Sequence, residues 1–134
     1  MKFLRRLFLV AFVAFAGGLW ALAAFVTPTL FYVQPDRHLA GVLAARMFTV
    51  ETGLALAAAL LAVLTPVRGK YLLGYLAAGL LTVNEWALKP VLETARLHGK
   101  AFGLGFGPWH GVSALLYVSA CVLVLVLTWR EGFR

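Results

Sequence analysis

Four long apolar stretches, separated by short polar or proline-containing segments, dominate the chain. Each stretch has close to the about 20 residues that an α-helix needs to cross the hydrocarbon core of a bilayer. Lipid offers the backbone no hydrogen bonds, so segments of this kind must be helical. We therefore predict an all-α fold, a polytopic membrane protein whose single domain, residues 1–134, is a bundle of four transmembrane helices. The predicted helices cover residues 5–26, 39–64, 71–90 and 108–129.

Residues 91–107 form the longest interruption of the apolar pattern. Between Val91 and His98 the apolar residues recur at helical spacing, and charged residues occupy the opposite face. We expect this short amphipathic segment outside the membrane. It either continues the third helix past the membrane surface or bends at Pro90 to lie along it. The glycine-rich residues 102–107 predict a flexible loop that returns to the fourth helix.

The composition indicates that a bilayer is the solvent of this chain. Hydrophobic side chains make up 63% of the 134 residues, charged side chains only 13%, and the mean hydropathy is +0.92. A soluble protein carries about 25% charged residues because its surface faces water. The single cysteine, Cys121, excludes an intrachain disulfide and any Cys-X-X-Cys metal or redox motif. The lipid bilayer is the expected partner, and a second copy of the chain or another membrane protein is a further candidate.

The net charge of +7 indicates membrane topology rather than nucleic-acid binding. With four helices, both termini lie on one side of the membrane. Cytoplasmic loops are enriched in Lys and Arg, and the terminal side carries seven such residues against four on the other side. We expect a multi-pass protein of the cell membrane, of the bacterial inner-membrane kind, with both termini in the cytoplasm. The seven are Lys2, Arg5, Arg6, Arg68, Lys70, Arg130 and Arg134, and the four are Arg37, Lys89, Arg96 and Lys100.

Two ionisable residues lie inside the predicted second helix. At a rise of about 1.5 Å per residue, Arg46 lies roughly 10 Å below the outer boundary, from where its side chain can reach the surface. Glu51 lies roughly 18 Å deep, near the midplane, and its side chain cannot. A carboxyl group at that depth must be protonated, paired or in contact with water inside the bundle. Glu51 is therefore the first candidate for a functional residue, and a structural interhelical hydrogen bond is the alternative.

Polar residues also form a stripe on one face of the predicted fourth helix. The stripe consists of His110, Ser113, Tyr117 and Cys121, which follow one another at helical spacing. Asn84 in the third helix is level with the upper part of this stripe. Two interpretations fit the pattern equally. The residues line a polar path from an outer mouth at His110 down to Glu51, or they hydrogen-bond the helices together and bind nothing.

The histidines lie too far apart in the sequence to predict a metal or haem site. Histidine is the commonest metal ligand, but His38, His98 and His110 lie in three different segments, so that His110 is a lone candidate ligand. Hydrolytic catalysis is not expected either, because no acid is placed to orient His110 beside Ser113. We expect no enzyme activity and no cofactor. A haem or metal-binding membrane protein is the third interpretation.

Several short strings resemble the small membrane proteins grouped with eukaryotic transmembrane protein 205, whose shared domain is one of unknown function. They are Phe-Val-Thr-Pro-Thr-Leu-Phe at 25–31, Arg-His-Leu-Ala-Gly at 37–41, Val-Asn-Glu-Trp-Ala-Leu-Lys-Pro at 83–90 and Trp-His-Gly-Val-Ser at 109–113. The resemblance implies a four-helix membrane fold and gives Asn84, Pro90, His110 and Ser113 as positions that match family motifs. The association of that group with resistance to metal-based drugs motivates an efflux hypothesis.

The leading hypothesis is a membrane protein with a polar pocket that opens to the non-cytoplasmic side and binds or transports a small solute or cation. In this hypothesis Glu51 is the deep charge. The other candidate ligand or pathway residues are Arg46, Asn84, His110, Ser113 and Tyr117. The alternative is a structural or partner-binding scaffold without a transported ligand.

Overall fold

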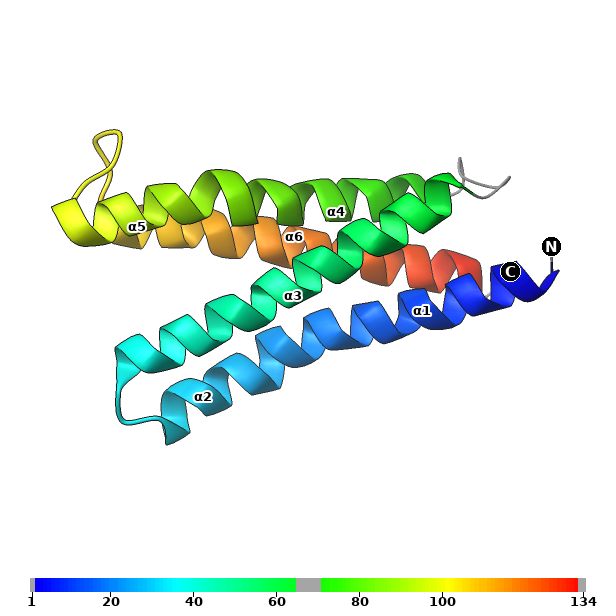
Figure 1. Cartoon of the computed structure of the whole chain (residues 1–134), viewed down its shortest axis with the longest axis horizontal. Coiled ribbons are helices and arrows are strands. Elements are labelled where there is room, and N and C mark those ends of the chain that lie inside the picture. Colours follow the sequence, from blue (N-terminus) through cyan, green and yellow to red (C-terminus); the bar gives the residue numbers. More distant parts are fainter. Residues whose placement is uncertain (1, 65–70, 133–134) are drawn as a thin grey trace.

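The computed structural model describes residues 2–64 and 71–132, and these fold into four long helical rods (Figure 1). The all-α fold predicted from the sequence is thereby confirmed. The first rod consists of α1 (Lys2–Ala21), a π-helical turn (Leu22–Val26) and α2 (Thr27–Val33), and the second rod is α3 (Arg37–Val63). The third rod consists of α4 (Leu72–Val83), a second π-helical turn (Asn84–Leu88) and α5 (Lys89–His98), and the fourth rod is α6 (Phe106–Gly132).

The first rod continues past Thr27-Pro28, where the sequence pattern predicts its end. Proline has no N–H, and its ring clashes with the carbonyl four residues back, which ends or kinks a regular α-helix. Here the helix widens instead, and the N–H of Thr27 donates to the carbonyl of Leu22, five residues back. The added width accommodates Pro28, and the rod runs on to Val33.

The third rod repeats this arrangement at Lys89-Pro90. The N–H of Lys89 donates to the carbonyl of Asn84, again five residues back, and Pro90 follows directly. Figure 1 shows α5 continuing in the direction of α4. Of the two arrangements predicted for this amphipathic segment, the structure therefore has the one that prolongs the helix. The rod ends at Gly99, whose φ of 81° lies in the left-handed region that favours glycine after a helix.

Short connections at one end of the molecule are held by specific hydrogen bonds. The side chain of Asp36 accepts from the backbone N–H groups of His38 and Leu39, at 2.9 and 3.2 Å, and caps the start of α3. Between α5 and α6, the backbones of Ala101 and Leu104 pair with each other, and the indole N–H of Trp109 donates to the Ala101 carbonyl at 2.8 Å. The loop that the sequence predicts to be flexible is thus fixed at this point.

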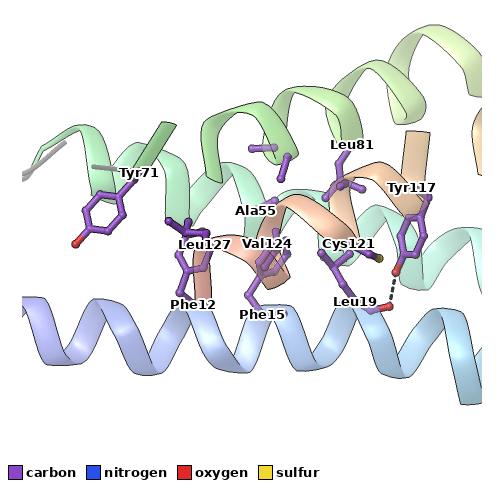
Figure 2. Packing of buried hydrophobic residues seen from close by; sticks show 14 of the residues in the cluster. Phe12, Phe15, Leu19, Ala55, Tyr71, Leu81, Tyr117, Cys121, Val124 and Leu127 are labelled. Atoms are coloured by element: carbon purple, nitrogen blue, oxygen red, sulfur yellow. Dashed lines mark hydrogen bonds between the residues drawn. The ribbon is translucent and has the colours of Figure 1, made fainter. Parts of the chain in front are cut away.

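The rods pack as a ring in which α1 and α4 each contact both α3 and α6. The first rod begins and the fourth ends at the same end of the bundle (Figure 1). The buried cluster fills the centre of the ring (Figure 2). Side chains cross it diagonally, and Phe12 of α1 reaches Gly74 of α4 so closely that a Cβ on Gly74 would lie 2.6 Å from the Phe12 ring. Because Gly74 has no side chain, the Phe12 ring can occupy the space between α1 and α4 at the centre of the bundle.

Three of the rods described by the structure are long and apolar enough to cross a membrane. They are Val10–Val33, Arg37–Val63 and Phe106–Glu131. Each carries many large apolar side chains on its outer surface, such as Phe25, Leu60 and Leu115, and a surface of that kind is suited to lipid rather than to water. The chain is therefore a membrane protein. The third rod is less apolar because Asn84, Glu85 and Lys89 lie within it.

Candidate functional site

Glu51 of α3 lies against Gly18 of α1. A Cβ on Gly18 would lie 2.5 Å from Oε1 of Glu51, so the carboxyl group occupies the space that a side chain at position 18 would fill. The other carboxyl oxygen, Oε2, is buried and has no hydrogen-bond partner among the described residues. The close fit to Gly18 therefore places an unpaired carboxyl oxygen between two of the apolar rods.

Tyr117 of α6 lies beside this carboxyl group. Its hydroxyl donates to the backbone carbonyl of Leu19 at 2.7 Å (Figure 2), and its ring meets that of Phe48 edge-on, with centroids 4.8 Å apart. Tyr117 and Cys121 both lie close enough to Glu51 for an electrostatic interaction with it. Glu51, Tyr117 and Cys121 thus gather at one level of the bundle, from α3 and α6, against α1.

Asn84 and Ser113 form a separate pair between the third and fourth rods. The hydroxyl of Ser113 donates to the Asn84 side-chain carbonyl at 2.6 Å, and the Asn84 amide donates to the backbone carbonyl of Ser113 at 3.2 Å. The bond from Ser113 satisfies the side-chain oxygen of Asn84, the first residue of the second π-helical turn. The polar atoms of the pair are engaged with each other, which is the arrangement expected of interhelical hydrogen bonding.

The other two predicted site residues lie on the surface. His110 is exposed and stacks on Phe106, with ring centroids 5.6 Å apart and an angle of 14° between the planes. Arg46 is exposed on α3. Of the six predicted site residues, the structure therefore brings Glu51 close to Tyr117 and joins Asn84 to Ser113, while His110 and Arg46 stand apart. Within residues 2–64 and 71–132, no group of three or more His, Cys, Asp or Glu side chains is arranged to hold a metal ion.

A polar cluster that the sequence only half predicts joins α3 to the second π-helical turn. The Lys89 ammonium lies 2.7 Å from the Glu85 carboxylate, and their separation by four residues indicates such a pair. The sequence gives no sign of the third member, Thr49, whose hydroxyl donates to Glu85 at 2.6 Å and accepts from Lys89 at 2.9 Å. Glu85 is only 12% exposed. The charge of Glu85 is thus paired by two exposed side chains at the edge of the bundle.

A small cavity lies between α1, α3 and α4, away from the predicted polar path. Its volume is about 10 Å³, roughly what one water molecule requires. The lining residues are Phe12, Phe15, Ala55, Ala58, Ala59, Ala62, Tyr71, Gly74 and Tyr75. None of the six predicted site residues lines it, and its one-water size is too small for a solute.

Two hydroxyl groups resemble Glu51 in being buried without a partner among the described residues. They are Oγ1 of Thr27, directly after the first π-helical turn, and the hydroxyl of Tyr75, which lines the cavity. Neither residue stood out in the sequence, because Thr and Tyr are ordinary in transmembrane helices and a Thr hydroxyl can donate to a carbonyl of its own helix. Thr82 and Thr128 do so, by donating to carbonyls four residues back. The unpaired state of Thr27 is therefore a property of the fold.

Long apolar rods around a few buried polar groups define a small helical membrane protein. The chain belongs to the DUF4149 family, a domain of unknown function, whose family model matches residues 10–129. No curated protein and no solved structure matches the chain.

Proposed function

We propose that all four rods cross the bilayer, so that the protein is a four-helix membrane bundle with both termini in the cytoplasm. The third rod, residues 72–98, has 27 residues and a length of about 40 Å, enough for the whole bilayer. Its polar residues are paired, Asn84 with Ser113 between the rods and Glu85 with Lys89 and Thr49. The distribution of Lys and Arg supports the orientation, as expected for a bacterial inner-membrane protein.

The function that the site supports best is the binding and movement of a small cation at Glu51, without enzyme activity. The observation that supports this function is the buried Oε2 of Glu51, which has no hydrogen-bond partner among the described residues. A carboxylate in that position is costly inside a membrane, so the group gains stability by binding a cation, including a proton. Reversible binding at mid-depth is what a carrier or channel for a small cation requires. The resemblance to the transmembrane protein 205 group and its link to drug resistance fits a transport function.

Flux through proteoliposomes tests this function. We expect vesicles with the purified protein to dissipate an imposed proton or Na⁺ gradient faster than protein-free vesicles, as followed by an entrapped pH- or Na⁺-sensitive dye. Glu51→Gln should remove the difference, since it keeps the shape of the side chain and removes the charge. Glu93→Gln, which alters an exposed carboxylate on α5, is the matched control and should leave the flux intact. Equal flux for the wild type and Glu51→Gln would contradict the proposal.

A structural scaffold is the second candidate, and the Asn84–Ser113 pair favours it because both side chains are occupied with each other. In that case Glu51→Gln would lower the thermal stability of the detergent-solubilised protein, and no ion would bind or move. A second copy of the chain or another membrane protein would then be the ligand. The third candidate, haem or metal binding through His110, predicts a coloured or metal-containing native preparation.

A further inference from the structure

The turn between α5 and α6 presents a large aromatic side chain at an unfavourable backbone position. The backbones of Ala101 and Leu104 pair in both directions, at 2.8 and 3.1 Å, so that Phe102 and Gly103 form the tip of a tight two-residue turn. Their φ angles of 49° and 80° both lie in the left-handed region. Glycine and asparagine suit such a tip, whereas phenylalanine is uncommon there. Because Phe102 is also 86% exposed, its ring calls for a reason outside the core.

Contacts with α6 hold this tip in a fixed position. The indole N–H of Trp109 donates to the Ala101 carbonyl at 2.8 Å, and the Phe102 ring meets the Trp109 ring edge-on, with centroids 6.4 Å apart. One edge contact leaves most of the Phe102 ring uncovered. Figure 1 shows the turn standing out sideways from the end of α5, across the long axis of the bundle. The ring is therefore displayed beside the rods rather than packed between them.

Further apolar side chains surround the tip. Leu97, near the end of α5, is 64% exposed, and Leu104 and Phe106 are exposed as well. Lys100 lies in the same stretch and is exposed, and residues 97–106 include no acidic residue. The chain thus joins an apolar surface to positive charge at this corner of the bundle. Segments that lie in the membrane surface combine the same two features.

The depth of the turn follows from the lengths of the two rods that it connects. The hydrocarbon of a bilayer extends about 15 Å to each side of the midplane, or about ten residues of helix. Counted from the centre of the third rod, residues 72–98, it ends near Ala95, and counted from the centre of α6 it ends near Trp109. The headgroup layer occupies roughly the next 5–7 Å. Both counts place the turn in this layer, and Phe102 packs on the residue at its lower boundary.

We propose that the turn is a lipid anchor, in which Phe102 inserts between the headgroups of the non-cytoplasmic leaflet and Lys100 meets lipid phosphate. The proposal goes beyond cation binding at Glu51 and rests only on the third rod crossing the bilayer. A tip that stands out sideways at headgroup depth lies over the lipid around the bundle, so lipid is the partner that the geometry brings to it. Insertion removes the apolar ring from water, and the Lys100 ammonium reaches the phosphates on its flexible stem.

The depth of a nitroxide spin label in a phospholipid nanodisc tests the anchor. Cys121→Ala provides a background without the native cysteine, and labels are attached to Phe102→Cys, Val83→Cys and Pro35→Cys. Relaxation by molecular oxygen, which concentrates in lipid, is compared with relaxation by a water-soluble nickel chelate. We expect the label at position 102 to favour oxygen. Val83 is exposed near the middle of the third rod and reports whether the rod crosses, and Pro35, in the polar turn at the same end, is the matched control.

The three labels separate the anchor from the topology on which it rests. If the label at 83 favours oxygen but the label at 102 is as accessible to nickel as the label at 35, the rod crosses and the anchor is wrong. If the label at 83 is itself accessible to nickel, the third rod does not cross and both ideas fail. If the label at 102 is shielded from both reagents, a protein covers the tip, a second copy or another partner, which also contradicts a lipid anchor.

Substitutions of Phe102 give an independent measurement. Asparagine suits the left-handed backbone, so Phe102→Asn should melt in detergent at the wild-type temperature or above. It should lose part of the rise in melting temperature that the wild type gains on transfer from detergent to the nanodisc. Phe102→Trp, which keeps an aromatic ring at the membrane surface, should retain that rise. If Phe102→Asn lowers both melting temperatures equally, the ring acts by packing on Trp109 and the anchor is wrong.

Discussion

Asn84 and Ser113 hydrogen-bond each other twice across the third and fourth rods, once between side chains at 2.6 Å and once to the Ser113 carbonyl at 3.2 Å. The pair lies at the start of the second π-helical turn, where the rod departs from regular helix. A hydrogen bond between membrane helices contributes modestly, because the unfolded protein in lipid also finds partners. Even so, this pair fixes how α4 and α6 are aligned along their length.

Removal of this pair should destabilise the bundle measurably. In a double-mutant cycle of Asn84→Ala and Ser113→Ala, we expect a coupling energy of about 1 kcal/mol. Reversible unfolding in mixed micelles measures it. Ser119→Ala is the control, because the hydroxyl of Ser119 donates to the Leu115 carbonyl within its own helix. Additive effects of the two substitutions would show that the pair is not formed in the membrane.

Gly74 should tolerate no side chain while Phe12 is present. Gly74→Ala places a methyl group 2.6 Å from the Phe12 ring and 3.3 Å from a Leu127 methyl, so the core is overpacked. The expected cost is about 1–3 kcal/mol, and the added change Phe12→Leu should recover most of it. Gly79→Ala, at a site with nothing within 4 Å, is the matched control and should be neutral or stabilising. Thermal unfolding in detergent compares the three variants.

Gly18→Ala should act on Glu51 rather than on stability. The new methyl group would meet Oε1 at 2.5 Å, and because this oxygen is at the end of a flexible side chain, the carboxyl group can move aside. We expect a shifted infrared C=O band and reduced flux with a melting temperature close to that of the wild type. Gly17→Ala, one residue away with nothing within 4 Å, should change neither. An unshifted band in Gly18→Ala would mean that Glu51 points elsewhere.

The ion pair on α5 gives a prediction about pH. Hydrogen bonds from Arg96, at 2.6 and 3.2 Å, hold the pKa of Glu93 below its ordinary value. A lowered pKa in the folded state stabilises the protein above the ordinary pKa and ceases to do so as the pH falls through the lowered value. Arg96→Ala should return the pKa of Glu93 upward, as measured by NMR titration. Both side chains are exposed, so the unfolding temperature should change little.

The apolar pattern of the sequence predicts the rods but not their interruptions. A stretch of about 20 apolar residues must be helical in lipid, and all four predicted helices are present as rods. The sequence around Thr27-Pro28 reads as a helix end, and at Lys89-Pro90 it leaves open whether the helix continues or bends, because proline usually ends or kinks a helix. Whether the helix ends at the proline or widens into a π-helical turn and continues depends on packing against neighbouring rods. Local sequence does not contain that information.

The candidate site is likewise predicted only in part from the sequence. Depth along one helix singles out Glu51, and helical spacing places Ser113, Tyr117 and Cys121 on one face of α6, where Tyr117 and Cys121 are buried. The sequence does not predict which residues these side chains meet on the neighbouring rods. That Glu51 lies over Gly18, or that Thr49 meets Glu85, depends on how two rods are aligned relative to each other. A shift of one turn would bring in different residues, and the sequence of neither rod specifies it.

The molecule consists of two halves, each with one π-helical turn, and the two halves should differ in how they tolerate substitutions. Each half is a helical hairpin that begins with an interrupted rod and ends with a 27-residue helix. In the second half the polar groups of the interruption are occupied, so damage there should appear first as lost expression and misfolding. In the first half they are unoccupied, so substitutions there should leave a well-folded but inactive protein. A library of variants, sorted separately for abundance and for activity, would therefore be expected to separate at the boundary between the hairpins.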